Sequence, residues 1–298
     1  MKKTALVLLS ALLSAPTFAA DVVNIYSFRQ PFLIQPILDD FTKQTGIKTN
    51  VVFAKKGLIE RVKREGKHSK ADLVLTSNFS ALIQLEDLGL TQSINSDVVN
   101  ANVPSTFRDA DGQWIALTKR VRNVYSSKER VGALAELTYE DLADPKYKGK
   151  ICTRSGKHPY NLGLVASMVA HHGEAKTKQW LEGVKANLAR KPQGNDRAQV
   201  KAVKEGLCDL ALGNSYYFGK MMQDEQQKSW AEAVYINFPN QTNRGSHINV
   251  SGVVMTRYAK NPENALKLIE YMTDNKAQNM YASVNMEYPV KQGVALSE

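Results

Sequence analysis

The residues best suited to chemistry in this chain are two adjacent tyrosines, Tyr216 and Tyr217. The run from Cys208 to Leu212 is short and apolar, as in a buried strand, and residues 213–215 interrupt it before a helical pattern from Phe218 to Gln227. The pair therefore lies at a strand-to-helix turn, where open α/β sheets bind ligands. A phenol that meets a cation loses its proton and becomes an anionic oxygen donor. The alternative is that one ring packs in the core and the other caps the helix.

The amino-terminal segment has the three parts of a secretory signal. Basic residues in Met1-Lys2-Lys3 precede an apolar run from Ala5 to Leu13, and the small-residue site Thr17-Phe18-Ala19 follows. We expect residues 1–19 to be a signal peptide cleaved after Ala19. The apolar run is too short to span a bilayer, and no cysteine follows at once to carry a lipid anchor. The sequence predicts a free periplasmic protein.

Export makes the two cysteines informative. Cys152 and Cys208 are an even count in an oxidising compartment, which suggests one disulfide. Such a bridge would tie together two strands of one lobe. Two unpaired buried thiols remain the alternative, because the sequence cannot establish the geometry that a disulfide needs.

The chain is basic, with 39 Lys and Arg against 29 Asp and Glu and a formal charge of +10, which becomes +8 when Lys2 and Lys3 leave with the signal. The positive residues are dispersed, apart from Lys55-Lys56 and the run Arg61–Lys70 on an amphipathic helix and its exit loop. Export argues against a nucleic-acid partner. We interpret the charge as favouring an anionic ligand or an acidic docking surface.

Short strands alternate with regular helices in the first part of the chain. The expected strands are Val22–Ser27, Lys48–Phe53 and Ala71–Thr76, and the expected helices are Phe32–Thr45, closed by Gly46, Leu58–Glu65 and Leu82–Leu88. This βαβαβ order predicts an α/β fold with a parallel sheet and helices on both faces.

A second α/β unit follows. The alternating segment Leu117–Tyr125 predicts a long strand that leaves the first unit, Thr138–Leu142 a capped helix start, and Lys150–Arg154 a strand. The second unit extends to about Phe238. Because 298 residues exceed a usual single core, we expect two lobes joined by strands.

Four segments carry a resemblance to a known family: Thr138–Lys146, Tyr147–Cys152, Asn195–Val203 and Asn214–Gly219. With the exported start and the two lobes, they resemble the periplasmic ferric-ion-binding proteins of the iron-deficiency-induced type, which are solute receptors of ABC transporters. The resemblance implies the type II periplasmic-binding, transferrin-like fold, with hinge strands between two lobes that close on Fe(III). Lobe 1 would comprise residues 20–118 and 246–298, and lobe 2 residues 119–245.

The resemblance also implies the function and the metal ligands. Such a protein is a monomer that captures ferric iron with a synergistic anion and delivers it to an inner-membrane ABC permease. Fe(III) is a hard cation that prefers anionic oxygens, so tyrosinate suits it, although free tyrosine has a pKa near 10. Tyr160, in the segment Gly156–Asn161, matches the family tyrosine of the same lobe. The expected metal ligands are Tyr160, Tyr216 and Tyr217.

The first loop departs from the family. Many relatives carry a histidine and a tyrosine there that ligate iron, whereas this chain has Gln30 and Pro31 after Arg29. Three tyrosinates leave roughly three positions of an octahedral ion open. Carbonate could fill two of them and water or an exogenous ligand the last. We expect Arg29, Gln30 and, from the family, Arg120 to bind this anion.

Other residues are weaker candidates. Arg122 lies near Arg120 on the same strand, and for both arginines a surface salt bridge is the alternative. We expect His171-His172 to end a helix before Gly173 and to be exposed, and we expect neither they nor His247 to bind metal. The family continues past Tyr288-Pro289 into further helices, whereas this sequence stops at Glu298. Loss of those helices would expose apolar surface on one lobe.

Rival classes differ in their motifs. A Gly-x-Ser-x-Gly elbow, a His-Glu-x-x-His helix and Cys/His metal spacing are all absent from the sequence, so an enzyme is not expected. A receptor for a polyamine, thiamine or an oxyanion shares the fold and is the main alternative, because the fold alone does not define the ligand. A visible colour from tyrosinate-to-iron charge transfer would separate the two.

Overall fold

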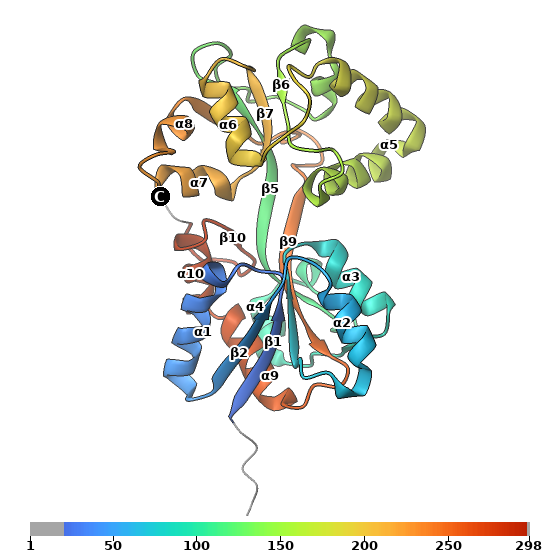
Figure 1. Cartoon of the computed structure of the whole chain (residues 1–298), viewed down its shortest axis with the longest axis vertical. Coiled ribbons are helices and arrows are strands. Elements are labelled where there is room, and N and C mark those ends of the chain that lie inside the picture. Colours follow the sequence, from blue (N-terminus) through green and yellow to red (C-terminus); the bar gives the residue numbers. More distant parts are fainter. Residues whose placement is uncertain (1–20, 297–298) are drawn as a thin grey trace, which may run out of the picture.

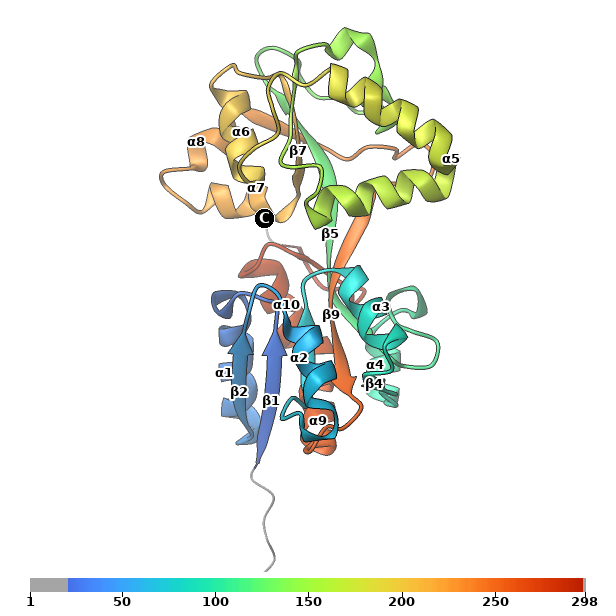
Figure 2. The same ribbon diagram turned by 45° about the vertical axis from the view of Figure 1, so that its right-hand side comes forward.

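The computed structural model describes residues 21–296, so the predicted signal peptide lies outside the described residues. The chain forms two lobes, drawn one above the other in Figure 1 and from a second side in Figure 2. Two long strands pass between the lobes, β5 (Ile115–Ser127) and β9 (Ile248–Thr256). The predicted lobe limits at 118/119 and 245/246 remain a proposal; the first falls within β5 and the second just before β9.

Lobe 1, the lower lobe in Figure 1, combines the beginning and the end of the chain. Its elements are β1 (Val22–Ser27), α1 (Pro31–Thr45), β2 (Lys48–Phe53), α2 (Leu58–Glu65), η1 (Gly66–His68), β3 (Leu73–Thr76), α3 (Phe79–Asp87), β4 (Thr91–Gln92), α4 (Asp97–Asn102), η2 (Ser105–Phe107), α9 (Pro262–Thr273), α10 (Asn275–Ser283) and β10 (Tyr288–Pro289).

Lobe 2, the upper lobe, comprises the middle of the chain. Its elements are η3 (Glu140–Ala143), η4 (Pro145–Tyr147), β6 (Ile151–Cys152), α5 (Pro159–Ala186), α6 (Asp196–Lys204), β7 (Leu210–Asn214), α7 (Tyr216–Met222), α8 (Lys228–Glu232) and β8 (Val234–Asn237). Within the described residues, none of the helices is both long and apolar enough to cross a bilayer.

The strands follow one path through both lobes, in the order β2-β1-β3-β9-β5-β7-β6. Strands β1, β2 and β3 are parallel, as predicted, and so are β6 and β7. The parallel sheet was predicted for the first three strands only; beyond them, β9 runs antiparallel to both β3 and β5, and β5 runs antiparallel to β7. The reversal occurs because the chain returns to lobe 1 along β9, beside the strand by which it left.

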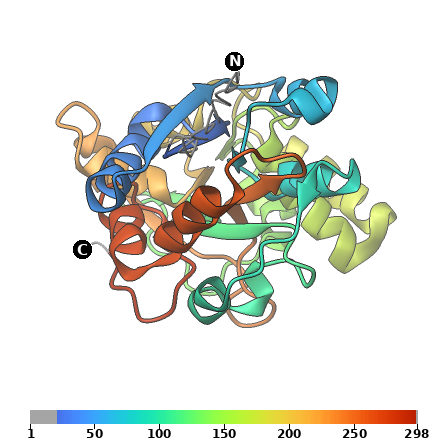
Figure 3. The same cartoon turned by 90° about the horizontal axis from the view of Figure 1, so that it is seen from below.

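Each lobe has its own apolar core. In lobe 1, helix α1 packs beside α9, with the rings of Phe41 and Tyr271 5.5 Å apart, and Figure 3 shows these helices from below. In lobe 2, one cluster lies under α5 and another between α6, α7 and the sheet. The predicted disulfide is confirmed: Cys152 on β6 is bonded to Cys208 just before β7, so it joins two adjacent strands beside the second cluster.

Several predicted boundaries differ from the structure in lobe 2. Strand β6 contains only Ile151–Cys152 of the predicted Lys150–Arg154, and the capped start at Thr138–Leu142 becomes the short 3-10 turn η3. Helix α7 is Tyr216–Met222 rather than Phe218–Gln227, because Ser215 already has helical backbone angles. The predicted helix end before Gly173 is confirmed: α5 consists of two helices that meet at Gly173, whose φ of 77° and ψ of 168° are not helical. The other helix boundaries in lobe 2 are set by turns that the apolar pattern does not reveal.

Candidate metal site in the cleft between the lobes

The tyrosine pair lies at the end of β7, in the first turn of α7. Strand β7 ends at Asn214, Ser215 turns the chain, and Tyr216 and Tyr217 are the first two helical residues. Their ring centroids are 4.1 Å apart, so the bend brings neighbouring side chains to the same cleft. This is the arrangement that the strand-to-helix turn predicts, and both rings are half-buried.

The third tyrosine meets this pair from another element. Tyr160 is the second residue of α5, and its backbone N–H donates to Nδ1 of His158, the residue that caps the helix, at 3.2 Å. Its hydroxyl lies 3.5 Å from the hydroxyl of Tyr216. The structure therefore brings all three predicted tyrosines into contact with the same cleft of about 460 Å³.

Tyr216 and Tyr217 both have a raised pKa, so their phenols are neutral unless a cation binds. Burial raises the pKa of Tyr216 well above its usual value, and its neighbours Tyr160 and Tyr217 raise it further, while Arg120 opposes them. Burial also raises the pKa of Tyr217, as do Tyr160 and Asp196. Converging phenols that resist ionisation one at a time are suited to ionise together around a strongly charged cation.

Arginines surround the rings. The guanidinium carbon of Arg154 lies 5.2 Å from the ring centroid of Tyr160, and that of Arg120 5.9 Å from the same ring. Arg197 lies 5.9 Å from the ring centroid of Tyr217. Arg120 favours the ionised form of Tyr216 and Arg154 that of Tyr217, so these two charges oppose the rise in pKa that burial causes.

A buried polar network supports the tyrosine wall from behind. The carboxylate of Asp196, at the start of α6, accepts hydrogen bonds from Arg122 at 2.7 Å, Arg154 at 3.1 Å and the backbone N–H of Asn214 at 3.0 Å. Arg122 also donates to Asn161, the neighbour of Tyr160, at 2.6 Å. The network therefore joins the segment before each tyrosine-bearing helix to the connecting strand β5.

The opposite wall is formed by lobe 1 and the connecting strand β5, and it holds the two arginines predicted to bind an anion. Arg29 donates to both oxygens of Glu287 at 2.7 Å each, and also to the hydroxyl of Ser251. Arg120 donates to Ser251 and to the backbone oxygen of Ser77, and lies 3.4 Å from Glu287. Both arginines line the cleft yet are nearly fully buried, with 5% of Arg29 and 2% of Arg120 exposed. The alternative that Arg120 forms a surface salt bridge is therefore wrong.

The remaining predicted residues take different places. Gln30 lines the same cleft just before α1. Arg122 is buried in the network around Asp196 rather than in a surface salt bridge. The expectation that the histidine pair is exposed holds for His171 but is wrong for His172, which is half-buried and contacts Glu140 at 2.6 Å. His247 precedes β9, and burial and Arg122 lower its pKa to about 4.

Sequence reasoning missed three residues that shape the cleft. Asp196 and Arg197 stand within a segment that carried the family resemblance, but their own roles were not predicted. Glu287 gave no signal, because its partner Arg29 is 258 positions away in the sequence. Pairs of opposite charge at such a separation cannot be recognised from spacing.

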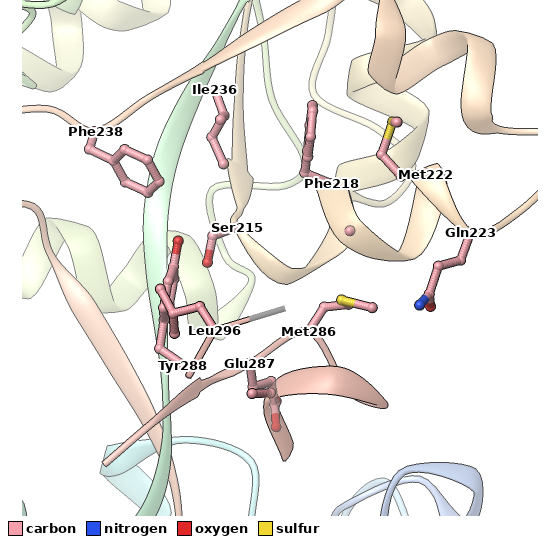
Figure 4. A pocket seen from close by; sticks show the side chains of 12 residues that line it. Ser215, Phe218, Met222, Gln223, Ile236, Phe238, Met286, Glu287, Tyr288 and Leu296 are labelled. Carbon is pink, nitrogen blue, oxygen red and sulfur yellow. The ribbon is translucent and has the colours of Figure 1, made fainter. Parts of the chain in front are cut away.

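A second hollow, of about 600 Å³, opens between the lobes beside the cleft (Figure 4). Its lining is mostly apolar and includes Phe218, Met222, Ile236 and Phe238 from lobe 2. Figure 4 shows the side chain of Glu287 directed away from these residues, toward lobe 1. The three predicted tyrosine ligands line the cleft but not this hollow, whereas Glu287 lines both.

Two α/β lobes joined by strands, with polar side chains from both facing one cleft, define a two-lobed solute-binding protein. Residues 68–298 match the family described as bacterial extracellular solute-binding protein. The chain is 43% identical over 279 residues to iron uptake protein A1 of Synechocystis, a match that covers 93% of this chain and 78% of that protein. The chain therefore belongs to the bacterial extracellular solute-binding proteins.

Solved structures agree with this assignment. The chain is similar to the apo ferric ion-binding protein A of Pasteurella haemolytica, with a TM-score of 0.89 and 55% identity over 93% of this chain and 87% of that chain. It is also similar to the Trichodesmium protein IdiA (FutA) in complex with iron and citrate ligands, with a TM-score of 0.88 and 39% identity over 93% of this chain and 89% of that chain. The predicted fold class and the predicted family are thus confirmed.

Proposed function

We propose that this protein captures ferric iron in the periplasm with Tyr160, Tyr216 and Tyr217 as ligands and delivers it to an ABC permease of the inner membrane. The observation that carries the proposal is the convergence of three phenols from two helices on one cleft, with two hydroxyls 3.5 Å apart. Phenolate oxygen is a hard anionic donor, which Fe(III) prefers, and polyamines or thiamine would not call for three such groups. The likeness to iron uptake protein A1 supports the same ligand.

An external anion completes the site in this proposal. The three tyrosinates balance the charge of one Fe(III), and the other wall offers the guanidinium groups of Arg29 and Arg120 with the amide of Gln30. A small planar anion such as carbonate can bind the metal on one side and arginine on the other. The anion would then join the lobes, so closure of the cleft depends on it.

A ferric titration tests the function. Metal-free protein in bicarbonate buffer receives Fe(III) as its nitrilotriacetate complex, and we expect an orange to red band that saturates at one ferric ion per chain. A Tyr235→Phe/Tyr258→Phe variant, which removes two exposed hydroxyls, is the matched control and should give the same band. Absence of any saturable visible band in the native sequence would remove ferric capture as the function.

The anion has its own test. Depletion of bicarbonate should weaken iron binding and shift the visible band. Arg29→Lys keeps a positive charge opposite Glu287 but loses the fork geometry, and should weaken iron binding in the same direction at fixed bicarbonate. If neither change affected iron binding, lobe 1 would have to supply a direct metal ligand instead.

A further inference from the structure

We propose that Glu287 is an internal counter-anion of the cleft, which occupies two donors of Arg29, lies 3.4 Å from Arg120 and thereby sets how much external anion the site requires. The proposal rests on the ferric function above and adds a residue that determines anion demand. Glu287 pairs with Arg29, lies close to Arg120, and belongs to a segment whose backbone is hydrogen-bonded to both lobes.

The contacts place a carboxylate where an external anion would bind. Glu287 receives one hydrogen bond from each arm of Arg29, at 2.7 Å, which is the bidentate arrangement that arginine offers to a carboxylate or carbonate. Only 4% of Glu287 is exposed. Burial raises its pKa, but the charge and hydrogen bonds of Arg29 outweigh burial and hold the pKa below its usual value. The group is therefore an anion at neutral pH.

The ionised carboxylate of Glu287 lowers the net positive charge of the wall that would bind an external anion. Arg29 and Arg120 bring two positive charges to this wall, and Glu287 neutralises one of them. The Nε group of Arg120 is buried and has no hydrogen-bond partner among the described residues, so one donor remains unused. An external anion thus meets a wall with one net positive charge and few free donors.

The backbone holds Glu287 in place from both lobes. On the lobe 1 side, its N–H donates to the backbone oxygen of Tyr281 at 3.2 Å, and Asn285 donates to the backbone oxygen of Leu33 at 3.0 Å. On the lobe 2 side, Lys220 of α7 donates to the backbone oxygen of Val284. These bonds hold the backbone of the segment, and the two hydrogen bonds from Arg29 hold the carboxylate itself.

Met286, the residue before Glu287, also holds the segment in place because it packs closely against α7. Met286 has a positive φ of 58°, and a Cβ atom placed on Gly219 of α7 would lie 2.7 Å from its Cγ atom. The segment that carries Glu287 therefore lies directly against the helix that begins with the tyrosine pair. Glu287 and the external anion must share the arginines, and their like charges repel each other.

The test compares Glu287→Gln with Glu65→Gln. Both changes replace a carboxylate that pairs with an arginine, but Glu65 pairs with Arg61 away from the cleft. The measurement is the bicarbonate concentration that gives half of the maximal visible band at fixed ferric nitrilotriacetate. We expect Glu287→Gln to lower this concentration at least about tenfold, since removal of a like charge within several ångströms is worth that much at an effective dielectric of about 20. Glu65→Gln should leave it unchanged.

An unchanged or higher bicarbonate requirement in Glu287→Gln would overturn the proposal, because it would mean that Glu287 only positions the arginines. A second measurement needs no iron: bicarbonate, or formate as a planar monocarboxylate probe, should raise the melting temperature of Glu287→Gln more than that of the native protein. If the variant folded only with formate, the anion would be replacing the lost carboxylate, as proposed. If no anion stabilised or refolded it, the proposal would fail.

The two proposals fail in different ways. A native protein without a ferric band would contradict the proposed function, while the iron-free melting experiment would still decide the role of Glu287. A native protein with a bicarbonate-dependent band, together with an indifferent Glu287→Gln variant, would contradict only the role of Glu287.

Discussion

The two walls of the cleft differ in how their polar groups are satisfied. On the lobe 2 wall, the hydroxyls of Tyr160 and Tyr216 are 3.5 Å apart, a weak contact, and the strong hydrogen bonds lie behind them around Asp196. On the lobe 1 wall, the charged groups themselves are paired, with Arg29 held by Glu287 at 2.7 Å. One wall presents uncommitted oxygen donors on a rigid support, and the other presents charges that are already partly neutralised.

This difference suggests that the two walls bind different ions. Under the proposed function, a trivalent cation needs anionic donors that no internal group has bound, and the tyrosines of lobe 2 would provide these. An anion that must later leave needs a positive wall of moderate strength, and an arginine pair shared with a carboxylate provides that. Lobe 2 would therefore determine the metal, and lobe 1 the accompanying anion and the ease of release.

The largest expected effect follows from removing the donors of lobe 2. Tyr216→Phe/Tyr217→Phe keeps both rings but removes two hydroxyl oxygens, so ferric binding should fall below detection in a chelator competition and the visible band should disappear. The melting temperature of the metal-free protein should change little, because the rings still pack. A double variant that kept its iron and its band would contradict the assignment of the metal to this wall.

Acid should release the iron. Burial raises the pKa of Tyr216 and of Tyr217, so both are protonated in the metal-free protein and must lose their protons on binding. Binding is therefore favoured as pH rises and opposed as pH falls, by about tenfold per pH unit for each proton released. Iron retention, measured against a competing chelator from neutral to mildly acidic pH, should fall steeply. A flat profile would speak against tyrosinate ligands.

A substitution in the polar network behind the tyrosines should lower ferric affinity less than removal of the tyrosine hydroxyls does. Asp196→Asn keeps the shape of the side chain but leaves Arg122 and Arg154 without their counter-charge. We expect ferric affinity to fall by roughly 10–100-fold, as for other residues that orient metal ligands, together with a shifted band. Asp209→Asn, which loses a partner of Arg130 in the same lobe, is the control and should leave both unchanged.

The smallest expected effect, on stability alone, comes from Glu140 and its partners Asn240 and Arg244, which lie outside the cleft. Burial raises the pKa of Glu140, but hydrogen bonds from Asn240 and Arg244 outweigh it and lower the pKa to about 2. Because the folded pKa lies below the ordinary value near 4.3, this stabilisation is present above that value and is lost as pH falls toward 2. Glu140→Gln should lower the melting temperature at pH 6, less so at pH 3, and leave the ferric band intact. A shifted band would mean that the two regions are coupled.

Much of lobe 1 could be predicted from the sequence because its signals are local. Strands Val22–Ser27 and Lys48–Phe53 and helix Leu58–Glu65 occur as predicted, since each apolar period is closed by a turn such as Gly46, which has a φ of 75°. The reversed direction of β9 was not predicted, because it follows from the return of the chain rather than from any local pattern.

The site was predictable where one segment carries the chemistry and not where distant segments meet. The tyrosine pair stands at a recognisable turn, and Tyr160 was placed by family resemblance. The pairs Arg29–Glu287 and Arg122–Asp196 join residues 258 and 74 positions apart, and only the folded chain brings them together. Anion binding by Arg29 stays a prediction, and the sequence did not predict its internal carboxylate partner Glu287.

The central claim is that the tyrosines of lobe 2 bind the metal, and resonance Raman spectroscopy of the iron-loaded protein tests it most directly. Excitation within the visible band enhances only vibrations of groups bonded to the iron. We expect tyrosinate ring modes that weaken in each of Tyr160→Phe, Tyr216→Phe and Tyr217→Phe and persist in Tyr235→Phe. A protein that retains one ferric ion but has no enhanced tyrosinate modes would contradict the account.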